Sequence, residues 1–323
     1  MARHVVELQH KHLEQAAGLA CRRYQNLREQ VPSLPPRYAN QEALLPMLVK
    51  LVDAGPAVAA FQQGRLVGFM TAWLIPSFRG LRSVISPELG NAAELGDSVR
   101  IYEQMYAHIA AAWVADGYTT HLVGMLANDR KGIEAWRWLG FGMFATDAIR
   151  DLAPVAEEIS EDIEILRADT EHLEAILQLE HGLAHHLAAS PVFLADAEPS
   201  SRDEGQRYLK DRDYAYWLAL RDNRPVAYLR IGPASEDAST IIYDEETASV
   251  TGAFTEPAAR GGGVAAALLD RALAWARKEG YTRCAVDFEP MNPQARRFWL
   301  RHFTEVCSFY VRHIDRRAVS PQS

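Results

Sequence analysis

Cysteine is scarce in this sequence. Its 323 residues include three, Cys21, Cys284 and Cys307, which lie far apart and are odd in number. Such a set provides neither a disulfide framework nor the close spacing of a structural metal site. The sequence therefore predicts no metal centre, and it favours a reducing, cytoplasmic location.

Long apolar runs and a positive net charge are absent as well. No apolar run has the length that spans a bilayer, and the first residues lack the apolar core of a signal peptide. The formal net charge at pH 7 is −8, which argues against a general nucleic-acid binder. We expect a protein with no nucleic-acid partner and no membrane partner.

What is present is the composition of a packed globular protein. Apolar residues make up 48% of the chain and charged residues 24%, as in ordinary folded domains. The length is enough for two such domains. Residues 153–162 are acidic and contain a proline, and we interpret them as a linker. The predicted domains are residues 1–152 and 163–323.

The most informative stretch lies in the second half of the chain. Residues 249–255 have strand character, and Pro257 ends the strand because it cannot donate to a ladder. Arg260 and three glycines, Gly261, Gly262 and Gly263, precede a helix predicted at Val264–Lys278. Glycines at a helix start allow close approach of the backbone, and the free N–H groups favour a phosphate. The stretch is interpreted as a pyrophosphate cradle rather than as a plain flexible turn.

Periodicity and turn residues outline the other elements. In the first half they predict helices within 13–52, strands at 57–62, 66–75 and 122–126, and helices at 99–115 and 132–139. In the second half they predict strands at 163–167, 214–221, 225–233, 284–289 and 306–314, and helices at 171–187, 202–209 and 293–301. Residues 76–96 are rich in Gly, Pro and Ser and are predicted to be irregular.

The two halves resemble each other in sequence. The corresponding pairs are Trp113 and Trp275, Gly117 and Gly280, Asn128 and Asn292, and Phe141 and Phe303. A period of about half the chain indicates a tandem duplication of a domain rather than a solenoid, whose repeats have about 20–50 residues.

The second half is similar to the GNAT superfamily of acyl-CoA-dependent N-acyltransferases. Arg260, Gly263 and Ala265 fit the signature that the family carries between its fourth strand and third helix. After the fifth strand, the family's Asn and the helix behind it are matched by Asn292, Ala295, Phe298 and Trp299. The resemblance implies two tandem α/β domains, each with a mixed, mostly antiparallel sheet flanked by helices.

The resemblance also implies roles for these residues. Backbone groups of Phe254 and Thr255 would bond the pantetheine arm of acetyl-CoA, the cosubstrate, in a slot where strands four and five splay apart. Amides of Gly261, Gly262, Gly263, Val264 and Ala265, with Arg260 at the rim, would hold the pyrophosphate. Asn292 and Trp299 would complete the cofactor site. The implied activity is acetylation of a primary amine of a small molecule or peptide, by a monomer or homodimer.

The first half departs from this pattern. The loop at the place of the cradle, residues 87–97, has no Arg or Lys and carries Glu88, Glu94 and Asp97. An acidic loop repels a pyrophosphate. We therefore expect a degenerate first domain that has lost normal cofactor binding.

Acyl transfer to an amine needs a base and an acid for the leaving thiolate. Glu246 and Glu289 are the candidate bases, and Asp287 shares a strand face with Glu289. The family's acidic Tyr is replaced by Trp299, so Tyr310 on the last strand is the substitute candidate. Solvated carboxylates and a core tyrosine are the plainer interpretations of these residues.

Three histidines and the missing Tyr leave alternatives open. His181, His185 and His186 share a helix without a third metal ligand nearby, so they form a surface or pocket-rim cluster that could line the acceptor site. Because the usual proton donor is missing, a non-catalytic acyl-CoA-binding or regulatory protein is the alternative function.

Overall fold

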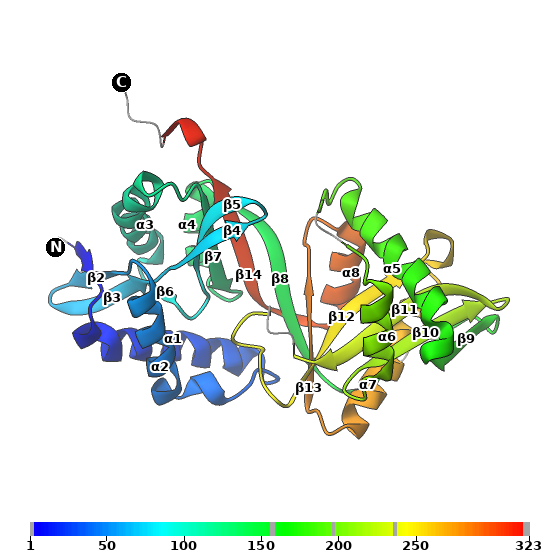
Figure 1. The fold of residues 1–323 in the computed structure, drawn as a ribbon. Helices are drawn as coiled ribbons and strands as arrows, with labels where there is room; N and C mark the ends of the chain where they lie inside the picture. Colours follow the sequence, from blue (N-terminus) through cyan, green and yellow to red (C-terminus); the bar gives the residue numbers. More distant parts are fainter. Residues whose placement is uncertain (1–2, 156–158, 196–197, 235–237, 319–323) are drawn as a thin grey trace. The chain divides into compact units, whose positions relative to one another are not determined.

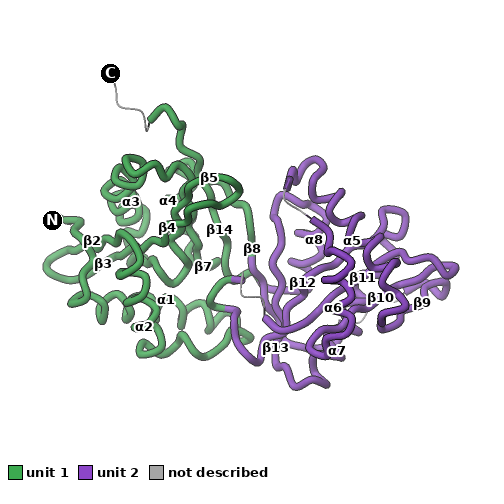
Figure 2. The backbone as a smooth tube through the Cα atoms, in the orientation of Figure 1, with its two compact units in different colours: residues 1–146, 239–241, 305–323 green, residues 147–238, 242–304 purple. Residues whose placement is uncertain are grey.

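The computed structural model describes residues 3–155, 159–195, 198–234 and 238–318. The chain forms two compact units, and Figure 2 shows both. Unit 1 consists of residues 1–146, 239–241 and 305–323, and unit 2 consists of residues 147–238 and 242–304. Part of the predicted linker, residues 156–158, lies outside the described residues.

Unit 2 contains one sheet in the order β8-β13-β12-β11-β10-β9. Its strands are β8 (Gly142–Asp151, of which residues 147–151 belong to this unit), β9 (Ile163–Arg167), β10 (Ala215–Arg221), β11 (Arg224–Pro233), β12 (Thr247–Thr255) and β13 (Arg283–Phe288). Its α-helices are α5 (Leu173–Ala188), α6 (Arg202–Lys210), α7 (Val264–Lys278) and α8 (Pro293–His302). From β9 to β12 neighbouring strands are antiparallel, and β12 and β13 are parallel.

Alternation along the strands of unit 2 gives the sheet two buried faces. Tyr216 and Leu218 of β10 pack with α5 and Phe254 in one core cluster. Ala215 and Ala219, the residues of opposite parity, pack with α7 and Trp299 in another. Helices therefore cover both faces of a mixed sheet, as Figure 1 shows, and the predicted fold class is confirmed.

Unit 1 contains two sheets, in the orders β1-β2-β3-β6 and β4-β5-β7-β14-β8. Its strands are β1 (His4–Glu7), β2 (Val58–Gln62), β3 (Arg65–Met70), β4 (Trp73–Phe78), β5 (Leu81–Ser86), β6 (Asn91–Ala93), β7 (Thr120–Leu126), residues 142–146 of β8, and β14 (Thr304–His313) except its first residue. Its α-helices are α1 (Leu13–Gln30), α2 (Gln41–Ala54), α3 (Ser98–Ala115) and α4 (Arg130–Trp138).

The last strand of each sequence repeat belongs to the other repeat's unit. β14 follows α8 in the chain, but it pairs antiparallel with β7, with Tyr310 opposite Val123. The second half of β8 follows α4, but it lies beside β13, and Ala148 is fully buried in the core of unit 2. The predicted boundaries, 1–152 and 163–323, follow the order of the repeats, whereas the compact units follow the strand pairing.

The expectation that residues 76–96 are irregular is wrong. They contain the end of β4 and all of β5 and β6. Arg79 and Gly80 both have positive φ, 50° and 73°, and form the tight turn that joins β4 to β5. The predicted strand 66–75 is in fact two strands, β3 and β4, and the strand β8 was not predicted at all.

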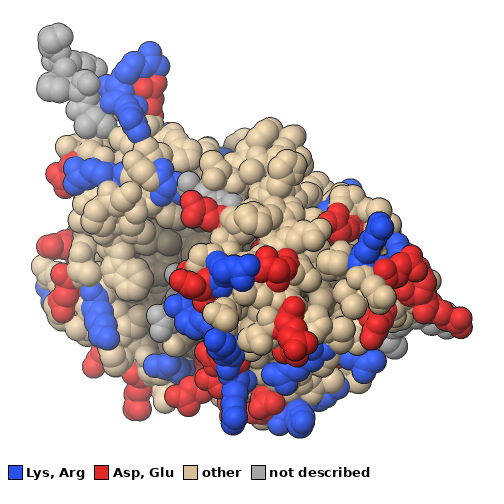
Figure 3. Space-filling view, turned by 45° about the vertical axis from the view of Figure 1, so that its right-hand side comes forward, with Lys and Arg blue, Asp and Glu red and all other residues tan. Residues whose placement is uncertain are grey.

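The surface and the helices give two further findings. On the face drawn in Figure 3, Lys and Arg side chains are interspersed with Asp and Glu side chains. In the part of the chain that the structure describes, no helix is long and apolar enough to cross a membrane.

Candidate active site

A pocket opens where two parallel strands of unit 2 separate. β12 and β13 form four residue pairs, from Thr247 opposite Arg283 to Val250 opposite Val286. Both strands then continue, β12 to Thr255 and β13 to Phe288, without further pairing to each other. The predicted divergence of these strands is therefore present, and it leaves the backbone of β12 without a ladder partner on that side.

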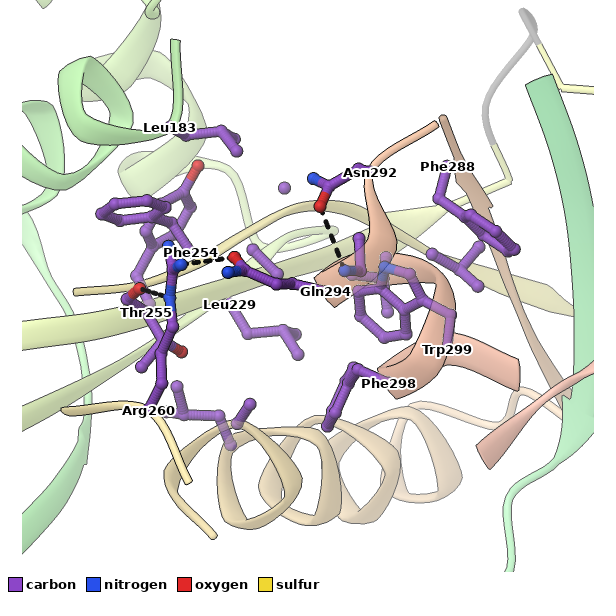
Figure 4. Close-up of a pocket in the computed structure, with 18 of the residues that line it drawn as sticks. Leu183, Leu229, Phe254, Thr255, Arg260, Phe288, Asn292, Gln294, Phe298 and Trp299 are labelled. Atoms are coloured by element: carbon purple, nitrogen blue, oxygen red, sulfur yellow. Dashed lines mark hydrogen bonds between the residues drawn. The ribbon is translucent and has the colours of Figure 1, made fainter. Parts of the chain in front are cut away.

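The pocket has a volume of about 580 Å³, within the usual range of roughly 300–1,000 Å³ for small-molecule and cofactor sites. Its wall is built by the end of β12, the glycine turn, the start of α8 and the α5 side chains Leu183, His186 and Leu187. Figure 4 shows Phe254 and Thr255 on one side of this space and Asn292, Phe298 and Trp299 on the other.

The start of α7 presents free backbone N–H groups to the pocket. Gly263 is the N-cap, with φ of 76°, and no side chain caps the helix. The first helical bond that follows runs from Ala267 N–H to the Gly263 carbonyl, so the N–H groups of Val264, Ala265 and Ala266 have no acceptor within the helix. The positive end of the helix dipole lies there too, and together they favour an anion.

Two observations show that the turn before α7 is open. Gly261 has φ of 84°, a conformation that glycine adopts without strain. A Cβ built on Gly261 or Gly262 would meet no atom within 4 Å. The turn thus leaves room in front of its backbone, as a phosphate cradle requires.

Arg260 lies at the rim of this turn. Its Nε donates to the Thr255 carbonyl oxygen at 2.9 Å, and its Nη1 donates to Gln294 Oε1. Its guanidinium carbon lies 5.8 Å from the centre of the Phe254 ring. As Figure 4 shows, the side chain connects the end of β12 with α8, which places a fixed positive charge beside the uncapped helix.

The opposite wall is formed by the start of α8. Asn292 is the N-cap, and its Oδ1 accepts from the Ala295 N–H at 3.3 Å. Trp299 packs against Phe298 and Phe303 and is 6% exposed. It is both a core residue and part of the pocket wall, and it has no phenol that could protonate a thiolate.

Several ionisable groups also line the pocket. Asp287 and Glu289 come from β13 and the residue after it, His186 comes from α5, and Arg301 and His302 come from α8. Of the three histidines on α5, His186 is the one that lines this pocket. The structure thus brings Glu289 together with the predicted cofactor residues.

Two predicted catalytic residues lie elsewhere. Glu246 precedes β12 at the end opposite Thr255, and its Oε2 accepts from Arg283 Nη2 at 3.0 Å. Tyr310 lies in unit 1, 2% exposed in that unit's core, and burial raises its pKa. Neither lines the pocket, because strand register and the exchange of β14 carry these side chains away.

A buried polar cluster beside β12 was not predicted from the sequence. Arg230 of β11 bonds to Thr251 of β12, to Tyr216 and to Glu180 of α5. Glu180 and Tyr216 are 4% and 1% exposed. The available signal was a charged residue between apolar strand neighbours, Leu229 and Ile231, together with a carboxylate on the apolar side of a helix.

Comparison with known proteins gives a family for this region. Residues 181–303 match the model described as the Acetyltransferase (GNAT) family. No curated protein sequence matches the chain.

Solved structures resemble the whole chain. A GCN5-related N-acetyltransferase from Sphaerobacter thermophilus aligns with a TM-score of 0.56 and 14% identity, over 96% of this chain and 95% of that one. A GCN5-related glucosamine N-acetyltransferase region of a fungal multi-domain GH3 beta-N-acetylglucosaminidase aligns at 0.51 and 13%, over 96% of this chain and 38% of that one. A tandem GNAT protein from the clavulanic acid biosynthesis pathway aligns at 0.48 and 13%, over the full length of both chains. At these identities the likeness is one of fold.

Proposed function

Residues 181–303 are a region of the GNAT acetyltransferase family, and from this premise we propose that the chain transfers an acetyl group from acetyl-CoA to a primary amine of a small molecule or peptide. The observation that supports the proposal is the pocket between β12 and β13, with the uncapped start of α7 in its wall. Few other ligands need an extended strand edge and a phosphate-binding helix start in one pocket.

The residues of the pocket fit an acyl-CoA. The pantetheine arm would lie along the unpaired side of β12 and bond the backbone of Phe254 and Thr255, as an added strand does. The amides of the glycine turn and of the first turn of α7 would hold the pyrophosphate, with Arg260 as the charge partner. Asn292 and Trp299 would form the wall on the α8 side.

The chemistry requires a nucleophilic amine beside the thioester. Glu289 lines the same pocket as the cofactor residues, and we assign it as the base that removes a proton from the amine, directly or through water. As the amine forms the C–N bond and the C–S bond breaks, the thiolate takes a proton from water, because Trp299 offers none. His186 lies on the α5 side, where it contacts the Phe254 ring at 6.4 Å between ring centres.

The test combines cofactor binding with turnover. We expect calorimetry to detect acetyl-CoA binding, and we expect thiol release from acetyl-CoA to be accelerated by at least one member of a panel of primary amines. Glu289→Gln should lower that rate by about 100-fold without weakening binding. Binding without turnover on any amine would instead support a non-catalytic acyl-CoA-binding protein, and absence of binding would refute both functions.

A further inference from the structure

The strand that borders the pocket contains a β-bulge. In the ladder between β11 and β12, Arg230 lies opposite Gly252, but the next pair is Ile231 opposite Val250. Thr251 is therefore an extra residue on β12, and bulges of this kind redirect backbone groups beside active sites. Both Thr251 and Gly252 line the pocket.

Arg230 holds this bulge with two hydrogen bonds. Its Nε donates to Thr251 Oγ1 at 2.8 Å, and its Nη2 donates to the Thr251 carbonyl oxygen at 2.9 Å. The planar guanidinium makes both bonds to one residue, a geometry that a lysine cannot reproduce. The direction of the Thr251 carbonyl is thereby fixed.

The guanidinium is itself held from the other side. Its Nη1 donates to the Tyr216 hydroxyl at 3.0 Å and lies 3.5 Å from Glu180 Oε1. The Tyr216 hydroxyl donates to Glu180 Oε1 at 3.2 Å, and Ser200 N–H donates to Glu180 Oε2 at 3.2 Å. Neither Glu180 nor Tyr216 lines the pocket, so this cluster acts on the pocket through the bulge.

The fixed carbonyl determines where the next N–H points. In a trans peptide the C=O and the following N–H point in opposite directions. Because the Thr251 carbonyl faces Arg230, on the sheet face covered by α5 and α6, the Gly252 N–H points away from that face. The ladder to β13 ends at Val250, so β13 does not use this N–H.

We propose that Arg230 is a positioning residue, which turns the Thr251–Gly252 peptide so that the Gly252 N–H bonds the thioester oxygen of acetyl-CoA. The inference rests on the proposed function. Acyl transfer needs a hydrogen-bond donor at that oxygen as negative charge develops there, and preorganised backbone N–H groups are effective donors because they need no reorientation. The buried cluster of Glu180, Tyr216 and Arg230 supplies the preorganisation.

The experiment removes the guanidinium without leaving a buried charge. Arg230→Met alone would strand the Glu180 carboxylate and destabilise the domain, so the variant is Arg230→Met combined with Glu180→Gln. The first readout is the infrared carbonyl stretch of acetyl-CoA labelled with ¹³C at the thioester carbon. We expect binding to wild type to lower this frequency, and binding to the double variant to leave it near its value in water.

Rates, affinities and melting temperature complete the test. The double variant should lose about 100-fold in acetyl transfer, the size expected for loss of one such donor, while the acetyl-CoA dissociation constant changes by less than about threefold. Thr251→Val removes one of the two bonds and should cost only a few-fold in rate. Arg230→Lys should retain the charge but not rescue the rate.

Arg283→Met is the matched control. Arg283 is also a strand arginine of unit 2 with carboxylate partners, Asp244 and Glu246, but it lies outside the pocket. Its substitution should lower the melting temperature and leave the carbonyl frequency unchanged. An equal frequency shift and equal rate in wild type and the double variant would overturn the positioning role. Failure of wild type to bind acetyl-CoA would instead show that the proposed function is wrong.

Discussion

The two units build the same strand pair and then treat it differently. In unit 1, β5 and β7 form four parallel pairs, from Ser83 opposite Thr120 to Ser86 opposite Val123. In unit 2, β12 and β13 also form four, and a pocket lies beyond them. The difference must therefore come from the side chains around the pair and not from the arrangement of the strands.

Corresponding positions on the first helix of each unit show how the space is used. Counted from the first residue of each helix, Arg23 in α1 and Leu183 in α5 occupy the same place. Leu183 lines the pocket of unit 2. Arg23 instead makes a buried salt bridge of 2.8 Å with Asp129, the N-cap of α4, as Asn292 is the N-cap of α8.

Polar contacts also join the two strands of unit 1 beyond their pairing. Asn91 Nδ2 donates to the carbonyls of Pro87 and Gly124 at 2.8 and 3.0 Å. Glu88 is 2% exposed and accepts from the Ile241 N–H at 3.2 Å. A slot of this fold therefore depends on apolar or small residues that leave space, and buried polar pairs in the same places make a structural core.

The largest expected effect is on the salt bridge of unit 1. Asp129→Ala should reduce the free energy of unfolding by about 3–5 kcal/mol, because it leaves the Arg23 guanidinium buried without its partner. Acetyl-CoA affinity should not change, since the pocket lies in unit 2. Chemical denaturation and calorimetry measure the two quantities, and a large loss of affinity would mean that unit 1 takes part in binding.

A negative charge in the glycine turn should abolish most cofactor binding. Gly262→Glu places a carboxylate in open space in front of the α7 amides, and repulsion from the phosphates should weaken acetyl-CoA by about 100-fold, or ~2.7 kcal/mol. Gly96→Glu, before α3 in unit 1, is the control because its Cβ would also meet nothing within 4 Å. Equal affinities for the two variants would refute the cradle.

Unit 1 should also be sensitive to acid. Burial lowers the pKa of His121 to about 4, and the neutral ring bonds Tyr106 Oη and the Tyr118 carbonyl. Between pH 6.5 and 4 the unfolded chain binds a proton that the folded chain excludes, so stability falls as the pH falls, by about 2 kcal/mol from pH 7 to pH 5. His121→Gln should flatten this part of the stability profile, whereas His108→Gln, at an exposed position, should leave it as in wild type.

The smallest effect is expected at the cap of α8. Asn292→Ala removes the acceptor for the Ala295 N–H and should cost about 1 kcal/mol of stability. Unlike Asp129→Ala, it should also weaken acetyl-CoA, because Asn292 lines the pocket. Denaturation with and without acetyl-CoA separates the two losses, and a loss of stability with unchanged affinity would reduce Asn292 to a helix cap.

Local signals allowed much of unit 2 to be predicted. The bounds of β9 and α7 were predicted exactly as Ile163–Arg167 and Val264–Lys278, because apolar periodicity, Asp169 and the glycine turn mark their ends. The turn Asp222–Asn223 between β10 and β11 was likewise predicted, and both residues have positive φ. Short polar residues tolerate this conformation, so the sequence itself carries the signal.

Features that depend on distant pairing could not be predicted. The bulge at Thr251 exists only relative to β11, and the role of Arg230 follows from that register. Glu246 and Tyr310 were chosen by their distance along the chain, which does not determine the end of a strand or the unit that a strand joins. In unit 1, the Gly and Pro residues of 76–96 suggested a loop, although tertiary pairing makes strands of most of it.

The exchange of final strands has a consequence for how the duplicated chain can change. A cut between Leu152 and Ile163 would leave the unit 1 sheet without β14 and the unit 2 sheet with the end of β8 detached from its chain. Each fragment would then expose unpaired backbone, the usual start of aggregation. The first repeat therefore cannot be deleted without removing a structural part of the second, which gives the chain a reason to keep a repeat whose own slot is filled.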